Sequence, residues 1–346
     1  MRRSRAAWSV AVLVGAVLLS AWASGTFSGA GATFPYPLYA RWAHAYRALT
    51  GSAFNYQSIG SGGGILQVQR GTVDYGASEY PLTPQDLNRF GLIQFPMVVG
   101  VVVPVVNLPG TDPSPLRLTP ELLADLFLGR VVRWNDPRIL ALNPGRDLPG
   151  LAVGIVGRAD GSGTTWLFTR YLSRIHPGFA SRVGVGPSVK WPSGIAAKGN
   201  EGVASYVREV PGALGYVEYA YAVQSGLRVV ALETPGGTFA EPNRASIRTA
   251  LDREDWALGP GLELDLMDSP EPGGWPILGA SYILLPREHK NPSKGRALLD
   301  YFDWCLREGA KAAEELHYFP LPPVVVNRVE THWKENVRSG GRAVWP

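Results

Sequence analysis

The sequence holds a single cysteine, Cys305, and this scarcity excludes two means of stabilisation. One cysteine cannot close a disulfide within the chain, and it cannot supply a zinc site built from several thiolates. The fold must therefore rest on a hydrophobic core. With 346 residues, 45% of them hydrophobic, the chain is long enough to bury such a core. Its length corresponds to about two domains of ordinary size.

Signatures of several common enzyme classes are also missing. No Gly-Lys-Ser/Thr stands at the Walker A spacing, the Rossmann glycine spacing is not found, and Ser162 lies in Gly-Ser-Gly rather than Gly-x-Ser-x-Gly. The five histidines are scattered, and no pair has the spacing of metal ligands. We therefore expect no catalytic residue, no metal ion and no cofactor.

The N-terminus has the pattern of a secretory signal peptide. Three arginines near the start precede an apolar run from Trp8 to Leu19, and Ala21-Trp22-Ala23 matches an A-x-A cleavage site. The alternative, a transmembrane anchor, fits less well because the apolar run is shorter than the roughly 20 residues that span a bilayer. We predict a cleavable signal peptide over residues 1–23, and no other segment has the length and apolarity of a membrane span.

The charge of the mature chain is close to balanced. Cleavage after Ala23 removes three arginines and no acidic residue, so the formal net charge falls from +4 to +1. This near neutrality argues against a nucleic-acid partner, which selects clustered lysine and arginine. No cysteine lies near the cleavage site to carry a lipid. We expect a soluble protein that is exported to the periplasm or another extracytoplasmic space.

Predicted strands alternate with predicted helices through much of the mature chain. This alternation favours an α/β fold with largely parallel sheets. Strands are expected at residues 54–56, 73–79, 97–106, 151–156, 215–219 and 277–285. Helices are expected at residues 38–49, from 65, from 119, from 164, at 293–310 and at 325–337. Residues 29–35 are interpreted only as a small-residue stretch before the first helix.

Three turns of small residues, at 32–34, 60–64 and 160–164, each run into a predicted helix. The first N–H groups of a helix lack partners within the helix and carry partial positive charge, so such ends bind anions. Side-chain hydroxyls in these turns would add donors, namely Thr33, Ser61, Ser162 and Thr164. The alternative is that each turn only caps its helix. Three such turns together, one of them beside Arg158, favour an anion site.

Several segments resemble the phosphate-binding protein of the bacterial high-affinity phosphate ABC importer. The most specific are residues 29–35, 59–61 and the block Arg158-Ala159-Asp160-Gly161-Ser162-Gly163-Thr164. Further matching segments follow in order along the chain at residues 189–192, 198–200, 211–220 and 302–304. Because the resemblance runs from about Gly29 to the C-terminus, the chain is identified as a member of this family.

The resemblance implies a two-lobed periplasmic binding protein of type II, with two α/β domains joined by crossover strands and the ligand in the interdomain cleft. Domain I is expected at residues 24–99 plus 276–346, and domain II at residues 100–275. Such a protein is monomeric and not an enzyme, and it delivers inorganic phosphate to the transmembrane permease subunits of an ABC importer. Two alternatives remain: a phosphate-ester hydrolase or transferase using the same anion site, and a phosphate scavenger or sensor without a transporter.

The resemblance also implies a set of phosphate ligands. Arg158 would supply a charged fork that Asp160 orients, and the remaining donors would come from Thr33, Phe34, Ser61, Ser162, Gly163 and Thr164. One position departs from the family, because Glu79 stands where an aspartate is usual. This carboxylate would accept the proton that phosphate keeps at neutral pH and would repel sulfate, which has no proton to donate. We expect the longer side chain to preserve selectivity and to alter affinity.

Overall fold

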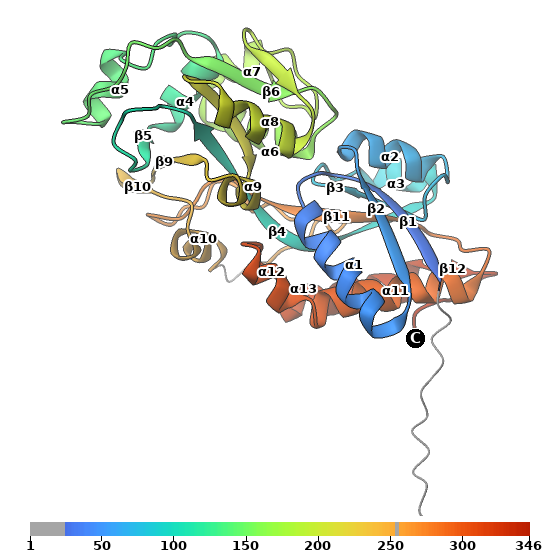
Figure 1. Ribbon diagram of the computed structural model, residues 1–346. Helices are drawn as coiled ribbons and strands as arrows, with labels where there is room; N and C mark the ends of the chain where they lie inside the picture. The colour runs from blue at the N-terminus through green and yellow to red at the C-terminus, as the bar shows by residue number, and fades with distance from the viewer. Residues whose placement is uncertain (1–24, 253–255) are drawn as a thin grey trace, which may run out of the picture.

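The computed structural model describes residues 25–252 and 256–346, so the predicted signal peptide at residues 1–23 lies outside the described residues. One mixed sheet of 11 strands runs through the molecule, with the main order β2-β1-β3-β11-β4-β8-β6-β7. Strand β4, Leu92–Val106, lies in its middle and is buried along its whole length. Its first part pairs with β11 and its second part with β8 and β9, so it joins two lobes (Figure 1).

The first lobe contains the first and the last described segments of the chain. Strand β1 pairs in parallel with β2 and β3, and β11 pairs antiparallel with β3 and β4. The bounds of these strands are Thr26–Gly31 (β1), Ala53–Ser58 (β2), Tyr75–Ser78 (β3) and Leu278–Pro286 (β11). Helices α2 and α3 lie on one side of this part of the sheet, and the other helices lie on the opposite side (Figure 1). The helices are Tyr36–Thr50 (α1), Ser61–Gln69 (α2), Pro84–Phe90 (α3), Pro292–Arg307 (α11), Ala310–Glu315 (α12) and Pro323–Asn336 (α13).

The second lobe is built from the middle of the chain. Strand β6 pairs in parallel with β7 and β8, while β9 pairs with β4, β5 and β10. Its strands are Leu116–Leu118 (β5), Gly154–Arg158 (β6), Ile195–Ala197 (β7), Ala213–Glu218 (β8), Arg228–Thr234 (β9) and Thr238–Ala240 (β10). Its helices are Pro120–Phe127 (α4), Pro137–Leu142 (α5), Gly163–Ile175 (α6), Pro177–Arg182 (α7), Gly199–Glu209 (α8), Tyr219–Gln224 (α9) and Arg244–Leu251 (α10). A short hairpin, Arg338–Ser339 (β12) with Arg342–Ala343 (β13), follows α13.

The predicted alternation of strands and helices is confirmed, with four local corrections. Strand β1 was not predicted, because its Gly-Ala-Gly sequence lacks the β-branched and aromatic residues typical of strands. The strand expected at 151–156 lies instead at Gly154–Arg158, and Ala152 before it forms only an isolated bridge with Arg133. Tyr219 starts helix α9 because the Glu218 carboxylate accepts a hydrogen bond from the N–H of Ala220. The helix expected at 293–310 ends at Arg307 and α12 follows.

A fifth correction concerns the sheet, which is mixed rather than largely parallel. Strands β4, β9 and β11 take part in antiparallel pairs, and two of them carry the chain between the lobes. Alternation of helices and strands along the sequence cannot reveal such crossover strands, because they return to a sheet that already exists.

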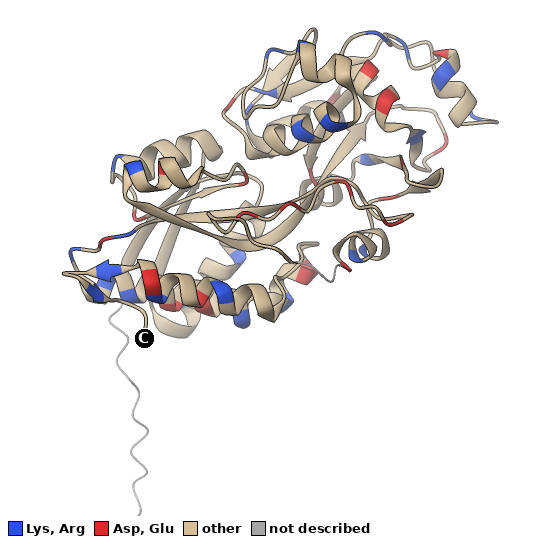
Figure 2. Ribbon diagram, turned by 180° about the vertical axis from the view of Figure 1, so that it is seen from behind, with Lys and Arg blue, Asp and Glu red and all other residues tan. Residues whose placement is uncertain are grey.

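Charged residues of both signs alternate along the helices near the C-terminus (Figure 2). Along α11, Arg296 pairs with Asp300 at 2.7 Å and Arg307 pairs with Asp303 at 2.9 Å, each across one helical turn. Within residues 25–252 and 256–346, no helix has both the length and the apolarity to cross a membrane.

Candidate anion site between the lobes

The predicted site residues gather where strands of both lobes end. In the first lobe β1, β2 and β3 are parallel, so the turns that follow them lie at one edge of the sheet. Those turns carry Thr33, Ser61 and Glu79. In the second lobe, β6 ends at Arg158 and leads through a short turn into α6. We call the meeting place of these segments the interlobe site.

The first turn is held by hydrogen bonds from tyrosines outside it. The Tyr221 hydroxyl donates to the carbonyl oxygen of Thr33 at 2.6 Å, and the Tyr318 hydroxyl donates to that of Phe34 at 2.7 Å. The Phe34 ring packs so closely on β4 that a Cβ added to Gly100 would lie 2.3 Å from it. The turn is therefore fixed against both the crossover strand and the second lobe.

The second turn touches the second lobe directly. Gly60 has a φ of 92°, a conformation that glycine adopts without strain, and Ser61 begins helix α2. The N–H of Gly62 donates to the carbonyl oxygen of Gly161 at 2.9 Å. A Cβ on Gly60 would lie 2.3 Å from a carboxylate oxygen of Asp160, so glycine is required for this approach of the two lobes.

The third turn presents a buried ion pair. The Arg158 side chain is 1% exposed, and its Nε donates to Oδ1 of Asp160 at 2.9 Å. Burial acts to raise the pKa of Asp160, but the hydrogen bonds and charge of Arg158 outweigh it and hold that pKa below its usual value. The Ser162 hydroxyl accepts a hydrogen bond from the N–H of Thr165 and caps α6. The turn therefore fixes a guanidinium beside a helix N-terminus.

Glu79 is the buried carboxyl on the first-lobe side, with 1% of its surface exposed. Ser281 donates to its Oε1 at 3.0 Å and Ser61 donates to its Oε2 at 3.2 Å. Burial raises the pKa of Glu79 from 4.5 to about 7, although these two hydrogen bonds and the charge of Arg158 act in the opposite direction. Its protonation therefore changes near neutral pH.

Hydrogen bonds connect most of the predicted site residues across the two lobes. The Ser61 hydroxyl accepts from the N–H of Gly163 at 3.0 Å, and a Cβ on Gly163 would lie 2.5 Å from Glu79 Oε2. Arg158 donates to the Thr164 hydroxyl at 3.3 Å. The structure thus brings all nine predicted residues to one place: Thr33, Phe34, Ser61, Glu79, Arg158, Asp160, Ser162, Gly163 and Thr164.

Sequence reasoning did not assign a role to Asn200, which lies at the start of α8 and is fully buried. Its side-chain amide donates to the hydroxyls of Thr33, at 2.8 Å, and Thr164, at 3.2 Å. The Lys-Gly-Asn segment that contributes to the family resemblance contains this residue, so its position was signalled although its contacts were not.

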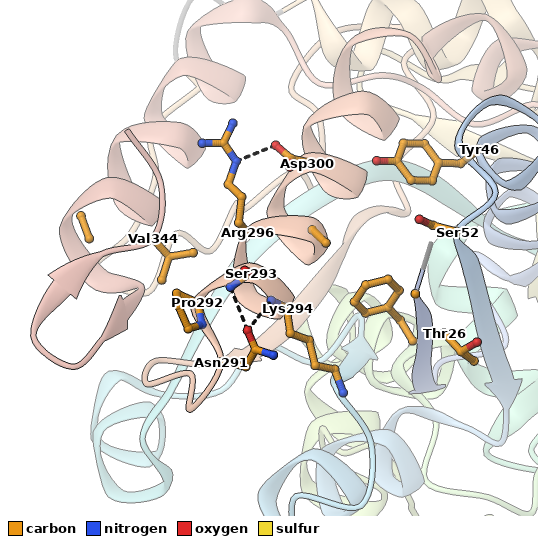
Figure 3. A pocket seen from close by; sticks show the side chains of 14 residues that line it. Thr26, Tyr46, Ser52, Asn291, Pro292, Ser293, Lys294, Arg296, Asp300 and Val344 are labelled. Carbon is orange, nitrogen blue, oxygen red and sulfur yellow. Dashed lines mark hydrogen bonds and ion pairs between the residues drawn. The ribbon is translucent and has the colours of Figure 1, made fainter. Parts of the chain in front are cut away.

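A separate cavity of about 910 Å³ lies in the first lobe (Figure 3). It is lined by the starts of β1 and α11 and by residues near the C-terminus, and none of the nine predicted site residues lines it. Lys294 in its wall pairs with Asp74 at 2.5 Å, and Arg296 pairs with Asp300. Each of these charged side chains in the cavity wall therefore has an ion-pair partner.

Fold and site together define a class, the two-lobed binding proteins of type II. Residues 19–308 match the PBP superfamily domain. The chain is 47% identical over 306 residues to a phosphate-binding protein PstS of Xylella fastidiosa, which covers 88% of this chain and 84% of that protein. It is 45% identical to the phosphate-binding protein PstS of Haemophilus influenzae, over 91% of this chain and 95% of that one. The chain belongs to the PstS family of phosphate-binding proteins.

Solved structures agree with this fold. A phosphate-binding protein from Stenotrophomonas maltophilia superposes with a TM-score of 0.70 at 20% identity, covering 91% of this chain and 96% of that one. A periplasmic phosphate-binding protein solved with bound phosphate at pH 8.5 gives a TM-score of 0.72 at 20% identity, covering 92% of this chain and 97% of that one. At these identities the likeness concerns the fold alone, and it confirms the two-lobed architecture.

Proposed function

We propose that this protein captures inorganic phosphate between its two lobes and presents it to an ABC permease for import. The observation that carries the proposal is a buried acceptor, Glu79, set opposite a buried guanidinium, Arg158, and two helix N-termini. Donors suit the anionic oxygens of a phosphate, and one acceptor suits its remaining proton. The names of the related proteins, and the phosphate bound in a structural neighbour, support the same ligand.

The proposed ligand set is the nine residues named above, and its energetics are sufficient. A hydrogen bond to a charged group contributes about 1.5–3 kcal/mol, whereas a micromolar dissociation constant needs about 8 kcal/mol. The Thr33 hydroxyl belongs to the first lobe, whereas Arg158 and the Thr164 hydroxyl belong to the second. Neither lobe alone therefore holds the whole set, and binding requires the lobes to meet.

Glu79 is proposed to discriminate phosphate from sulfate. Two negative charges about 4 Å apart repel by about 4 kcal/mol at an effective dielectric constant near 20, which corresponds to about a thousandfold in affinity. A phosphate that keeps a proton converts this repulsion into a charge-assisted hydrogen bond. Glutamate is one methylene longer than the family's usual aspartate, and Gly163 provides room because a Cβ there would meet Glu79.

The remaining parts of the proposal concern organisation and location. We propose that domain I comprises residues 24–99 plus 276–346 and that domain II comprises residues 100–275. The protein would be exported through a signal peptide cleaved after residue 23. The protein would act as a monomer in the periplasm or an equivalent extracytoplasmic space, where transmembrane permease subunits are its partners. The continuous strand β4 supports a hinge between the lobes.

Isothermal titration of the exported protein with phosphate, and separately with sulfate, at neutral pH tests the proposal. We expect tight one-to-one binding of phosphate and no heat with sulfate. Equal binding of both anions would retain the anion site but contradict the role of Glu79. Binding of neither would refute phosphate as the ligand. Family membership supports binding rather than hydrolysis, and sustained turnover of a chromogenic phosphate ester, abolished by Ser162→Ala, would contradict that conclusion.

A further inference from the structure

Asn200 joins two hydroxyls that belong to different lobes. Thr33 lies in the first turn of the first lobe, and Thr164 lies in the first turn of α6 in the second lobe. All three side chains are buried, and Asn200 itself has no exposed surface. The Asn200 amide donates one hydrogen to each hydroxyl, at 2.8 Å and 3.2 Å.

The orientation of the Asn200 amide is fixed by the backbone. Its Oδ1 accepts a hydrogen bond from the N–H of Glu218 at 2.9 Å. A backbone N–H can only donate, so the group that faces Glu218 must be the carbonyl oxygen and the group that faces the threonines must be the NH₂. The two hydroxyls therefore act as acceptors toward Asn200.

Each threonine hydroxyl accepts twice in this arrangement. Thr33 Oγ1 accepts from both the side-chain amide and the backbone N–H of Asn200, the latter at 3.2 Å. Thr164 Oγ1 accepts from Asn200 and from Arg158. A hydroxyl has two acceptor lone pairs and one hydrogen, so both hydroxyls keep only the hydrogen for a further contact.

We infer that Asn200 is a positioning residue that makes Thr33 and Thr164 donors toward a bound anion. The inference rests on the proposed function, since the anion it serves is phosphate. Without Asn200 each hydroxyl could turn an oxygen lone pair toward the ligand, which repels an anion. The Ser61 hydroxyl in the same site is arranged differently, because its hydrogen is already donated to Glu79 while its oxygen accepts from the N–H of Gly163.

A double-mutant cycle on the full exported protein tests this inference. We expect Asn200→Ala to weaken phosphate binding about tenfold, the equivalent of one to two hydrogen bonds. In a Thr33→Val/Thr164→Val background, the same change should cost less than about threefold, because the hydroxyls that Asn200 orients are gone. Asn143 is a matched control, since it is buried and makes three comparable hydrogen bonds to Arg117 and Ile139. Asn143→Ala should lower stability and leave phosphate affinity unchanged.

Asn200→Asp reverses the polarity with little change in size and serves if the alanine variant does not fold. It replaces the donor by an acceptor, so the hydroxyl hydrogens turn away from the anion. We expect a loss of about a hundredfold at neutral pH, with partial recovery as the new carboxyl is protonated at low pH. Wild-type affinity in either Asn200 variant, or an equal loss in the wild-type and valine backgrounds, would overturn the inference. Failure of the wild-type protein to bind phosphate would instead refute the proposed function.

Discussion

On the first-lobe side of the interlobe site the buried charged group is a lone carboxyl, Glu79, whereas on the second-lobe side it is an ion pair of Arg158 with Asp160. The pKa values of the two carboxyls shift in opposite directions, although burial acts to raise both. Burial raises the pKa of Glu79 to about 7, while the pKa of Asp160 lies below its usual value because the hydrogen bonds and charge of Arg158, together with the N–H of Gly199, outweigh burial. A guanidinium within hydrogen-bonding distance therefore decides which carboxyl stays ionised.

This difference suggests separate roles in anion binding for the two sides of the site. Asp160 occupies Arg158 through Nε and one terminal nitrogen, which orients the guanidinium and leaves its other terminal nitrogen toward Thr164. Glu79 accepts side-chain hydrogen bonds from two neutral hydroxyls, those of Ser61 and Ser281, and burial raises its pKa to about 7, so it can hold or release a proton near neutral pH. We therefore propose that the second side contributes most of the affinity for an anion, and that the first side contributes the choice between protonated and unprotonated anions.

The largest effect is expected for Arg158→Ala. This change removes the positive charge and leaves the Asp160 carboxylate buried without its partner, so we expect phosphate affinity to fall about a thousandfold. Calorimetric titration measures it. Arg158→Lys is the control, because it keeps the charge but loses the planar fork, and it should restore only part of the affinity. A loss of less than about tenfold in the alanine variant would show that affinity does not reside mainly on this side.

The second prediction concerns stability and pH in the ligand-free protein. Glu79 binds its proton more tightly when folded than when unfolded, since its pKa rises from 4.5 to about 7. The stabilising contribution of the Glu79 proton is therefore full below about pH 4.5 and is lost as pH rises to about 7. The free energy of unfolding changes by at most about 3 kcal/mol over this range.

Urea unfolding at pH 5 and pH 8 measures this slope. Glu218 is fully buried and its pKa is also raised by burial, so the wild-type slope contains both carboxyls. The comparison that matters is between wild type and Glu79→Gln, which removes only the Glu79 part. An identical slope in both proteins would mean that Glu79 does not titrate in this range.

Glu79→Gln also tests the choice of anion. The amide removes the charge that repels sulfate, so we expect the ratio of phosphate to sulfate affinity to fall about a hundredfold, within the range set by the Coulomb repulsion. Glu79→Asp, which restores the usual family residue, should keep the ratio and change only the affinity. Competition titration with both anions gives the ratio, and an unchanged ratio in Glu79→Gln would assign selectivity to another group.

The three turns of the proposed anion site could be predicted from sequence because the signal is local. Small residues before a helix expose backbone N–H groups, and the Arg-Ala-Asp-Gly-Ser-Gly-Thr block carries the family resemblance. The role of Glu79 was predicted only through the family resemblance, and the structure places this residue directly after β3. The turns need only neighbouring residues, and the structure brings the two turns of the first lobe and the turn after β6 of the second lobe together at the interlobe site.

The long-range contacts could not be predicted in the same way. Asn200 meets Thr33 across 167 positions in the sequence, and Tyr318 meets Phe34 across 284. The Asn200 bond joins the two lobes, whereas the Tyr318 bond joins two segments of the first lobe that lie far apart in the sequence. Strand β1 was missed because its small residues resemble a loop, yet a Cβ on Gly29 would lie 2.1 Å from the ring of Tyr75, so packing selects glycine there.

The smallest effect is expected for Ser162→Ala. Its loss of affinity can be compared with that of Arg158→Ala on the same side of the site. Loss of the cap on α6 should cost about 1 kcal/mol of unfolding free energy, and loss of one neutral donor should weaken phosphate binding about tenfold. Thr119→Ala removes a comparable cap from α4, where Thr119 accepts from the N–H of Leu122 at 3.1 Å. It should lower stability by a similar amount without changing affinity. Equal affinity losses in Ser162→Ala and Arg158→Ala would mean that the guanidinium is not a direct ligand, since charge and two donors must outweigh one hydroxyl.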